Sequence, residues 1–488
     1  MPTYSDIAVI KETLYKLIPF IVRQAHHERN QHLTVRPEPF DNTQESLVEG
    51  LNQRFLVGLV LLVFSQFSFA AAKIEHWQTS QGSRVYYVQA DALPMVDIQV
   101  VFDAGSARDG QQFGLAALTS ALLDTGAGQW NADQIALRFE SVGANFGTGV
   151  SSDNATLSLR TLTEPALFDK AVETMHVILA KPKFNNSDFL REKNRTLAGI
   201  KQREESPAEV ASEAFSNKLY GTHPYAHPDS GINDTVKKLK VTDLAQFYKK
   251  YYVSSNAMVV IVGNLTKEQA QQTAKKLLAD LPAGQKPETI PDVVMPTQAS
   301  QQHIEFPSTQ THVLVGLPGT WRKDPDYFDL YIGNHILGGS GLVSKLFVEV
   351  REKRGLAYSA SSAFSPMLKQ GPFVVSLQTR NDQTKQALEV LNTTLADFIN
   401  KGPTQAELDA AKKNIIGGFP MRFDTNKKLA TYVAMIGFYD LPLDYLDSFR
   451  QKVEETSIAS IADAFKRRVN AELLQTVTVG KSTASVAK

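Results

Sequence analysis

The chain has 488 residues, which is long for one domain, so two or more domains are expected. Its 51 Lys and Arg residues balance 51 Asp and Glu residues, which indicates neither a nucleic-acid-binding protein nor an acidic disordered tail. Because cysteine is absent from the sequence, disulfides, thiolate metal sites and cysteine nucleophiles are excluded, whereas the redox compartment is left open.

The N-terminal region contains the pattern of an export signal. Residues 55–64, FLVGLVLLVF, form an uncharged apolar run after an arginine, and a cluster of three alanines follows as a cleavage site. The run is shorter than the ~20 residues that span a bilayer, so a retained membrane anchor is the weaker alternative. We expect a signal peptide over 51–72, cleavage before Lys73, and a periplasmic protein with no membrane contact after cleavage. Residues 1–50 are polar and lack periodicity, and we expect them to be a non-native upstream extension.

The rest of the chain reads as an internal duplication. Residues 154–200 and 371–419 both have the pattern strand, turn, helix, loop, helix. Thr161 corresponds to Thr379 and Phe247 to Phe465, each 218 residues later in the chain. Separated correspondences at one offset indicate two copies of one design.

The order of the elements predicts an α+β fold. Strands such as VDIQVVF and THVLVGL cluster instead of alternating one-to-one with helices, which argues against a doubly wound sheet. We expect two homologous α/β-sandwich lobes, each an antiparallel sheet packed with helices, that enclose a cleft. Residues 282–302 contain four prolines and no helical pattern, so they are the expected linker between an N-terminal lobe (73–281) and a C-terminal lobe (303–488).

Several stretches together resemble one enzyme family. FGLAALTSALLDTGAG (113–128), GANFGTGVSSDNATLSL and GGSGLVSKLFVEVREKRGLAYSASS are similar to segments of the pitrilysin/insulinase group of zinc peptidases. The resemblance is strongest to the bacterial branch close to the mitochondrial processing peptidase, and it covers about residues 74–485. It implies the two-lobed fold and a zinc site in the N-terminal lobe.

The zinc ligands that the resemblance implies are missing. The family binds zinc through His-x-x-Glu-His on a helix, and the two histidines fall at Ala117 and Ala121 and the general base at Ser120. The third ligand, a glutamate, falls at or beside Ala198. Methyl groups cannot bind zinc and a serine is a poor substitute for a carboxylate base, so we expect no metal or other cofactor in this chain. Alanine is the best helix former, so the helix itself should persist.

A second set of family residues is present in the C-terminal half. The segment VREKRGLAY contains Arg351 and Tyr358, and the resemblance implies that such a pair acts on the substrate carbonyl. A permanent cation and a neutral O–H donor both suit an oxyanion. Arg354 is the neighbouring candidate, and the alternatives are a solvated arginine and a half-buried strand tyrosine.

Together with the missing ligands, the resemblance implies a subunit of a heterodimeric periplasmic zinc metallopeptidase that is catalytically silent by itself, because bacterial members of this branch can divide the zinc helix and the Arg/Tyr pair between two chains. A zinc-bearing homologous partner would hold the zinc, this chain would supply Arg351 and Tyr358 in trans, and peptides would be the substrates. The alternative is a structural or binding scaffold of the same fold with no role in proteolysis.

Overall fold

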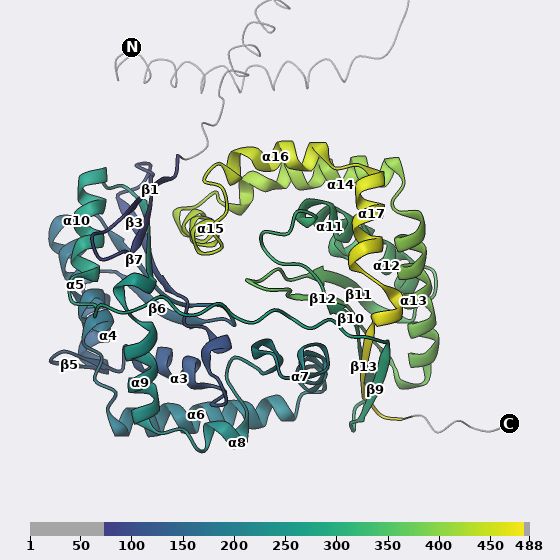
Figure 1. Cartoon of the computed structure of the whole chain (residues 1–488), viewed down its shortest axis with the longest axis horizontal. Coiled ribbons are helices and arrows are strands. Elements are labelled where there is room, and N and C mark those ends of the chain that lie inside the picture. The colour runs from purple at the N-terminus through teal and green to yellow at the C-terminus, as the bar shows by residue number, and fades with distance from the viewer. Residues whose placement is uncertain (1–72, 483–488) are drawn as a thin grey trace, which may run out of the picture. The chain divides into compact units, whose positions relative to one another are not determined.

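Residues 73–482 form two β-sheets with helices packed on them (Figure 1). The computed structural model describes these residues, and they belong to one compact unit of the chain. The expected signal peptide (51–72) and upstream extension (1–50) lie outside the described residues. No helix between residues 73 and 482 has both the length and the apolar character needed to cross a bilayer.

The first sheet has six strands in the order β1-β2-β8-β3-β7-β6, and the second has five in the order β11-β12-β10-β13-β9. The strands of the first sheet are β1 (Glu75–Gln78), β2 (Arg84–Gln89), β3 (Met95–Phe102), β6 (Asn145–Val150), β7 (Ala155–Leu162) and β8 (Ala257–Gly263). Those of the second are β9 (Ser300–Glu305), β10 (Gln310–Pro318), β11 (Ala357–Phe364), β12 (Pro372–Arg380) and β13 (Gln475–Gly480). The short strands β4 (Gly126–Ala127) and β5 (Trp130–Asn131) pair with each other.

The strand orders reproduce the duplication. Without β1, the first sheet reads β2-β8-β3-β7-β6, and the second reads β9-β13-β10-β12-β11 at corresponding positions. In each sheet the first strand of the repeat pairs in parallel with the last, β2 with β8 and β9 with β13, and the other pairs are antiparallel. The α+β fold with two similar lobes is confirmed, but the sheets are mixed where wholly antiparallel sheets were expected. The physical reason is that the chain between the two parallel strands of each repeat is long enough to serve as their crossover.

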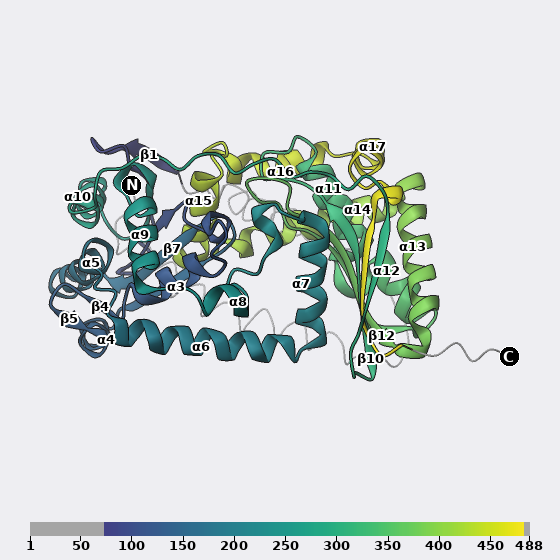
Figure 2. The same cartoon turned by 60° about the horizontal axis from the view of Figure 1, so that its bottom comes forward.

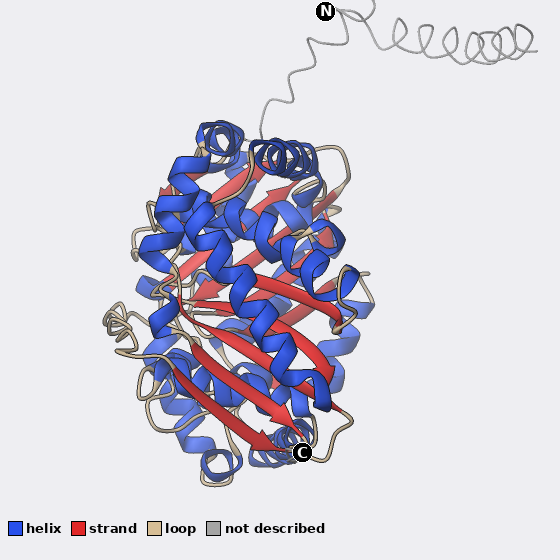
Figure 3. Cartoon of the chain, turned by 90° about the vertical axis from the view of Figure 1, so that its right-hand side faces the viewer, coloured by secondary structure: helices blue, strands red, loops and turns tan. Residues whose placement is uncertain are grey.

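Helices pack over the strands of the sheets (Figure 3). Those of the first half are α3 (Leu115–Leu122), α4 (Ala132–Glu140), α5 (Pro165–Ala180), α6 (Asn186–Glu204), α7 (Pro207–Tyr220), α8 (Asn233–Val236), α9 (Val241–Tyr251) and α10 (Lys267–Leu278). Those of the second half are α11 (Tyr327–Asn334), α12 (Lys345–Phe347), α13 (Thr384–Lys401), α14 (Gln405–Gly418), α15 (Asn426–Phe438), α16 (Tyr445–Glu455) and α17 (Ile458–Arg468). Residues 279–299, between α10 and β9, carry no helix or strand. The division of the chain at a linker over 282–302 stays a prediction.

The two halves exchange one helix each. Helix α7 of the first half packs against β10 and β13 of the second sheet, and α15 of the second half packs against β3 and β8 of the first (Figure 1). Buried Phe215 of α7 shares an apolar cluster with Val477 of β13, and Val433 of α15 shares one with Met258 of β8. Because burying apolar side chains is the main favourable term in folding, this exchange ties the two lobes together.

Candidate functional site

Helix α3 is the element on which the family's zinc motif would lie. Close backbone packing and hydrogen bonds to a buried carboxylate fix its N-terminus. It begins after Gly114, whose φ of 93° is left-handed and where a Cβ atom would come within 2.9 Å of the Ser230 carbonyl oxygen. The buried Asp109 carboxylate accepts hydrogen bonds from the backbone N–H groups of Gly114 and Ala116, both at 2.7 Å. These bonds satisfy donors that a helix leaves free in its first turn.

Two of the predicted positions lie together. Ala117 and Ala121, one turn apart on α3, line a pocket of about 690 Å³ whose other wall is α6. The helix α6 runs past α8 to α7 along one edge of the molecule (Figure 2). Gly199 on α6 lines the same pocket, whereas its neighbour Ala198 is not part of the lining. The third ligand position predicted at or beside Ala198 therefore faces the pocket at Gly199.

Ser120, the position predicted for the general base, does not line this pocket. Its residue is 3% exposed, and its hydroxyl is buried without a hydrogen-bond partner among residues 73–482. A hydroxyl enclosed in this way has no route to a substrate in the pocket. Geometry and chemistry both exclude Ser120 as a base.

The pocket contains a carboxylate that the sequence reasoning missed. Glu192 of α6 lines it, with its side chain 15% exposed and an ion pair to the Arg191 Nε at 3.3 Å. Glu192 precedes Gly199 by seven residues, about two helical turns, so both residues lie on one face of α6. That spacing is the signal that could have identified it.

These residues do not fit a zinc ion. Zinc sites use at least three protein ligands from histidine, cysteine and carboxylates. In the part of the chain that the structure describes, no three such side chains are grouped to hold a metal. Arg195 and Arg203 line the pocket alongside its carboxylates. Their positive charges would repel a bound cation.

The structure brings Arg351 and Tyr358 together in the second lobe. Arg351 lies in a π-helical turn (Val348–Glu352), and its guanidinium carbon is 4.4 Å from the centre of the Tyr358 ring and 4.8 Å from that of Phe347. Tyr358 lies on the edge strand β11, where the register against β12 shifts between Ala357 and Ala360. Such irregularities in helices and strands commonly re-aim side chains at functional sites. Tyr358 is 81% exposed, so its hydroxyl is presented to solvent beside the arginine.

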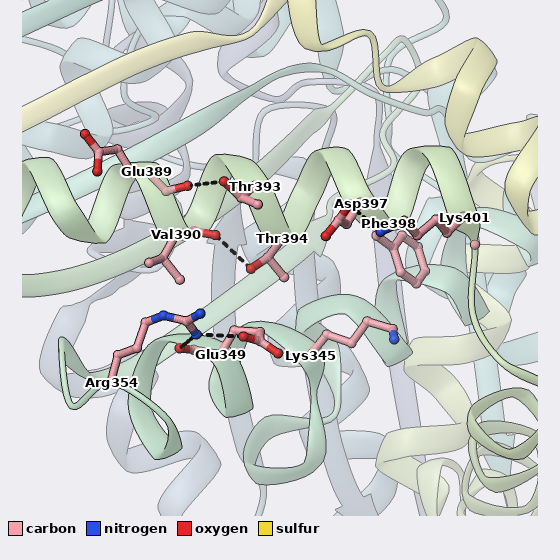
Figure 4. Close-up of a pocket in the computed structure, with 11 residues that line it drawn as sticks. Lys345, Glu349, Arg354, Glu389, Val390, Thr393, Thr394, Asp397, Phe398 and Lys401 are labelled. Carbon is pink, nitrogen blue, oxygen red and sulfur yellow. Dashed lines mark hydrogen bonds and ion pairs between the residues drawn. The ribbon is translucent and has the colours of Figure 1, made fainter.

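The neighbouring candidate, Arg354, uses its guanidinium group in contacts with Glu349. Its guanidinium donates to the Glu349 carbonyl oxygen at 2.8 Å and to the Glu349 carboxylate at 2.7 Å, at the rim of a separate pocket against α13 (Figure 4). Arg351, by contrast, makes no side-chain hydrogen bond or ion pair with any residue from 73 to 482 and only stacks on aromatic rings. Of the two arginines, Arg351 has its donors available to an external group.

Comparison with known proteins identifies the family. Residues 84–230 match the family described as Insulinase (Peptidase family M16), and residues 238–415 match the Peptidase M16 inactive domain. The crystal structure of a peptidase M16 inactive domain from Pseudomonas fluorescens is 36% identical with a TM-score of 0.82, over 84% of this chain and 98% of that chain. The chain belongs to the M16 peptidase (insulinase) family. The resemblance seen in the sequence is thereby confirmed.

Two further proteins are similar to this chain. The protein named non-peptidase homolog YmxG of Helicobacter pylori is 27% identical over 420 residues, which is 85% of this chain and 95% of that protein. The periplasmic protease PqqL from Escherichia coli is 16% identical with a TM-score of 0.71, over 84% of this chain and 46% of that chain, and so shares the fold. This chain is thus an M16 family member whose described residues lack a metal site.

Proposed function

We propose that this chain is the zinc-less subunit of a heterodimeric periplasmic metallopeptidase. It supplies Arg351 and Tyr358 in trans to the site of a zinc-bearing partner from the same family. The observation that carries the proposal is an asymmetry. The positions of the metal ligands hold Ala117, Ala121 and Gly199, whereas both members of the Arg351–Tyr358 pair are present, Tyr358 is exposed, and Arg351 is half-buried with only aromatic rings as side-chain contacts among residues 73–482.

The chemistry of the pair suits a peptide carbonyl. Stacking of the Arg351 guanidinium on two rings leaves its N–H edges free to donate, and the Tyr358 hydroxyl adds a second, neutral donor. Fixed donors of this kind stabilise the negative charge that develops on a carbonyl oxygen during hydrolysis. The chain alone lacks metal ligands and a base at α3, so peptide hydrolysis requires the partner.

The location follows from the N-terminal pattern. The apolar run at 55–64 and the alanines that end the stretch suit export with cleavage before Lys73. A protein of the same fold is named as a periplasmic protease, which supports the same compartment. Peptides and unfolded segments are the substrates that such a two-lobed pair would accept.

Reconstitution tests the proposal. The chain is purified together with a zinc-motif homologue from the same organism, and cleavage of a fluorogenic peptide is measured with Tyr358→Phe and Arg351→Gln variants. Each variant should assemble normally and lose roughly 10²–10³ in kcat, because one oxyanion donor is removed. The matched control is Arg354→Gln, which removes a neighbouring guanidinium that bonds Glu349 and should keep the wild-type kcat.

A scaffold without a role in proteolysis is the second candidate, supported by the relative named as a non-peptidase homolog. The same experiment decides between them. An assembled complex that cleaves at the wild-type rate with both Arg351 and Tyr358 replaced would establish the scaffold.

A further inference from the structure

A second pocket, of about 430 Å³, lies where the two halves of the chain meet. Strands β3 and β7 of the first sheet supply part of its wall, and helices α11, α15 and α16 of the second half supply most of the rest. Figure 1 shows α15 on the inner side of the first sheet, between the two lobes. The lining includes two arginines and four tyrosines and no acidic side chain: Arg322, Arg422, Tyr327, Tyr432, Tyr439 and Tyr445.

In the described part of the chain, both arginines lack an anionic partner. Neither Arg322 nor Arg422 forms an ion pair with an acidic side chain within residues 73–482. Arg322 is half-buried, and its Nε atom is buried without a hydrogen-bond partner, whereas Arg422 lies at the exposed rim. Arg468, by comparison, forms ion pairs with Asp324 and Asp326, each at 2.8 Å. A guanidinium group withdrawn from water gains most from an anion placed against it.

Two of the tyrosines, Tyr439 and Tyr445, are largely withdrawn from solvent. The Tyr439 ring lies 5.2 Å from the Arg322 guanidinium carbon, and its hydroxyl donates to the buried Asp153 at 2.9 Å. Asp153 therefore binds this tyrosine and not an arginine. Burial raises the pKa of Tyr439 and of Tyr445 well above the ordinary value for tyrosine, which itself lies above neutral pH, so both are neutral hydroxyls there.

The rest of the lining mixes apolar side chains with four uncharged polar ones, Gln99, Asn154, Thr156 and Thr431. Phe438, Phe449 and Met435 line the pocket beside the cationic groups. A pocket of this size with a few polar groups among aromatic side chains is typical of a small-ligand site. Its ligand should carry an oxyanion at one end and an apolar group next to it.

We propose that this pocket binds a carboxylate attached to an apolar or aromatic group, as in the C-terminal residue of a peptide. Arg322 and Arg422 pair with the carboxylate oxygens, a geometry for which the planar guanidinium is suited. The aromatic wall takes up the adjoining side chain. The site is independent of the proposed function, because this chain alone should bind the ligand without zinc or a partner.

Calorimetric titration of the chain tests the proposal with two matched probes. One is an N-acetylated tripeptide that ends in phenylalanine with a free carboxylate, and the other is the same peptide as its C-terminal amide. The acid should bind at least tenfold more tightly than the amide, and Arg322→Gln and Arg422→Gln should each weaken the acid at least tenfold. The control Arg354→Gln, outside the pocket, should leave the affinity unchanged.

A third probe, 3-phenylpropanoate, distinguishes the source of the carboxylate. Equal affinity for this acid and for the peptide acid supports a free organic acid, and tighter binding of the peptide supports a peptide terminus. Equal binding of acid and amide, no binding of any probe, or full affinity in both arginine variants would overturn the proposal.

If a variant folds poorly, the Tm of the wild-type chain with and without each peptide still tests the proposal. The peptide acid should raise the Tm of the wild-type chain, and the amide should not. This comparison needs no substitution, so an equal effect of the two peptides on the wild-type Tm would also overturn the site.

Discussion

Ala117, Ala121 and Gly199 are the residues that we propose occupy the positions of the family's zinc ligands, and all three line one pocket. The two alanines lie on one face of α3 and Gly199 lies across the same pocket. The sequence identified the alanines from the motif but left the third position uncertain by one residue. One residue along a helix turns the side chain by about 100°, so the choice between Ala198 and Gly199 required the packed face of α6.

Restoring the ligands should restore metal binding. The variant Ala117→His/Ala121→His/Gly199→Glu is expected to bind about one zinc per chain, measured by elemental analysis after dialysis, because its three side chains converge on one pocket. A Cβ atom at Gly199 meets no atom within 4 Å, so a side chain fits there.

The matched control replaces Ala198 by glutamate in place of Gly199, with both histidines kept. Its third carboxylate stands at a position that does not line the pocket, so its zinc affinity should be at least tenfold lower. Equal zinc affinity in the two triple variants would contradict the assignment of Gly199 to the pocket face.

At the scale of elements, the duplication predicted much of the architecture. Two segments repeated at an offset of 218 residues imply the same element order twice, and both sheets show the same strand order. The exchange of α7 and α15 between the lobes was not predictable, because an amphipathic helix reveals that one face is buried but not which sheet buries it. The register shift at Tyr358 could not be predicted from the sequence either, because the pairing of β11 with β12 depends on both strands together.

The first turn of α3 should make stability depend on pH through Asp109. Burial, with a smaller contribution from nearby Asp229, raises the pKa of the Asp109 carboxyl from 3.8 to about 8. The unfolded chain releases this proton near pH 4 and the folded chain only near pH 8. The free energy of unfolding therefore falls as the pH rises through this interval and levels off above it.

Urea unfolding of Asp109→Asn and of the wild-type chain at pH 5 and pH 8 measures this effect. The variant cannot titrate at this position, so the wild-type chain should lose more stability than the variant between the two pH values. One pKa unit corresponds to about 1.4 kcal/mol, so the difference is large enough to measure. Identical pH dependence in the two proteins would show that Asp109 is ionised in the folded state.

At the scale of the whole molecule, the lobes are joined by polar contacts as well as by the exchanged helices. Asp153, in the turn between β6 and β7, is 2% exposed and accepts three hydrogen bonds. The Tyr225 hydroxyl of its own half donates at 2.6 Å, and the Leu368 N–H and Tyr439 hydroxyl of the other half each donate at 2.9 Å. One carboxylate thus connects three segments that are far apart in the sequence.

Replacing Asp153 by alanine should weaken the attachment of the lobes to each other. Each buried donor left without an acceptor costs roughly 1–3 kcal/mol, so the free energy of unfolding should fall by several kcal/mol in urea titrations. Hydrogen exchange should rise at Leu368, because its N–H loses its acceptor. The control Asp169→Ala removes an exposed carboxylate of the same lobe that pairs with Lys276 at 3.6 Å, and it should change stability by less than about 1 kcal/mol. If the two variants were equally stable and equally protected at Leu368, Asp153 would not be a junction of the lobes, and the exchanged helices α7 and α15 alone would hold them together.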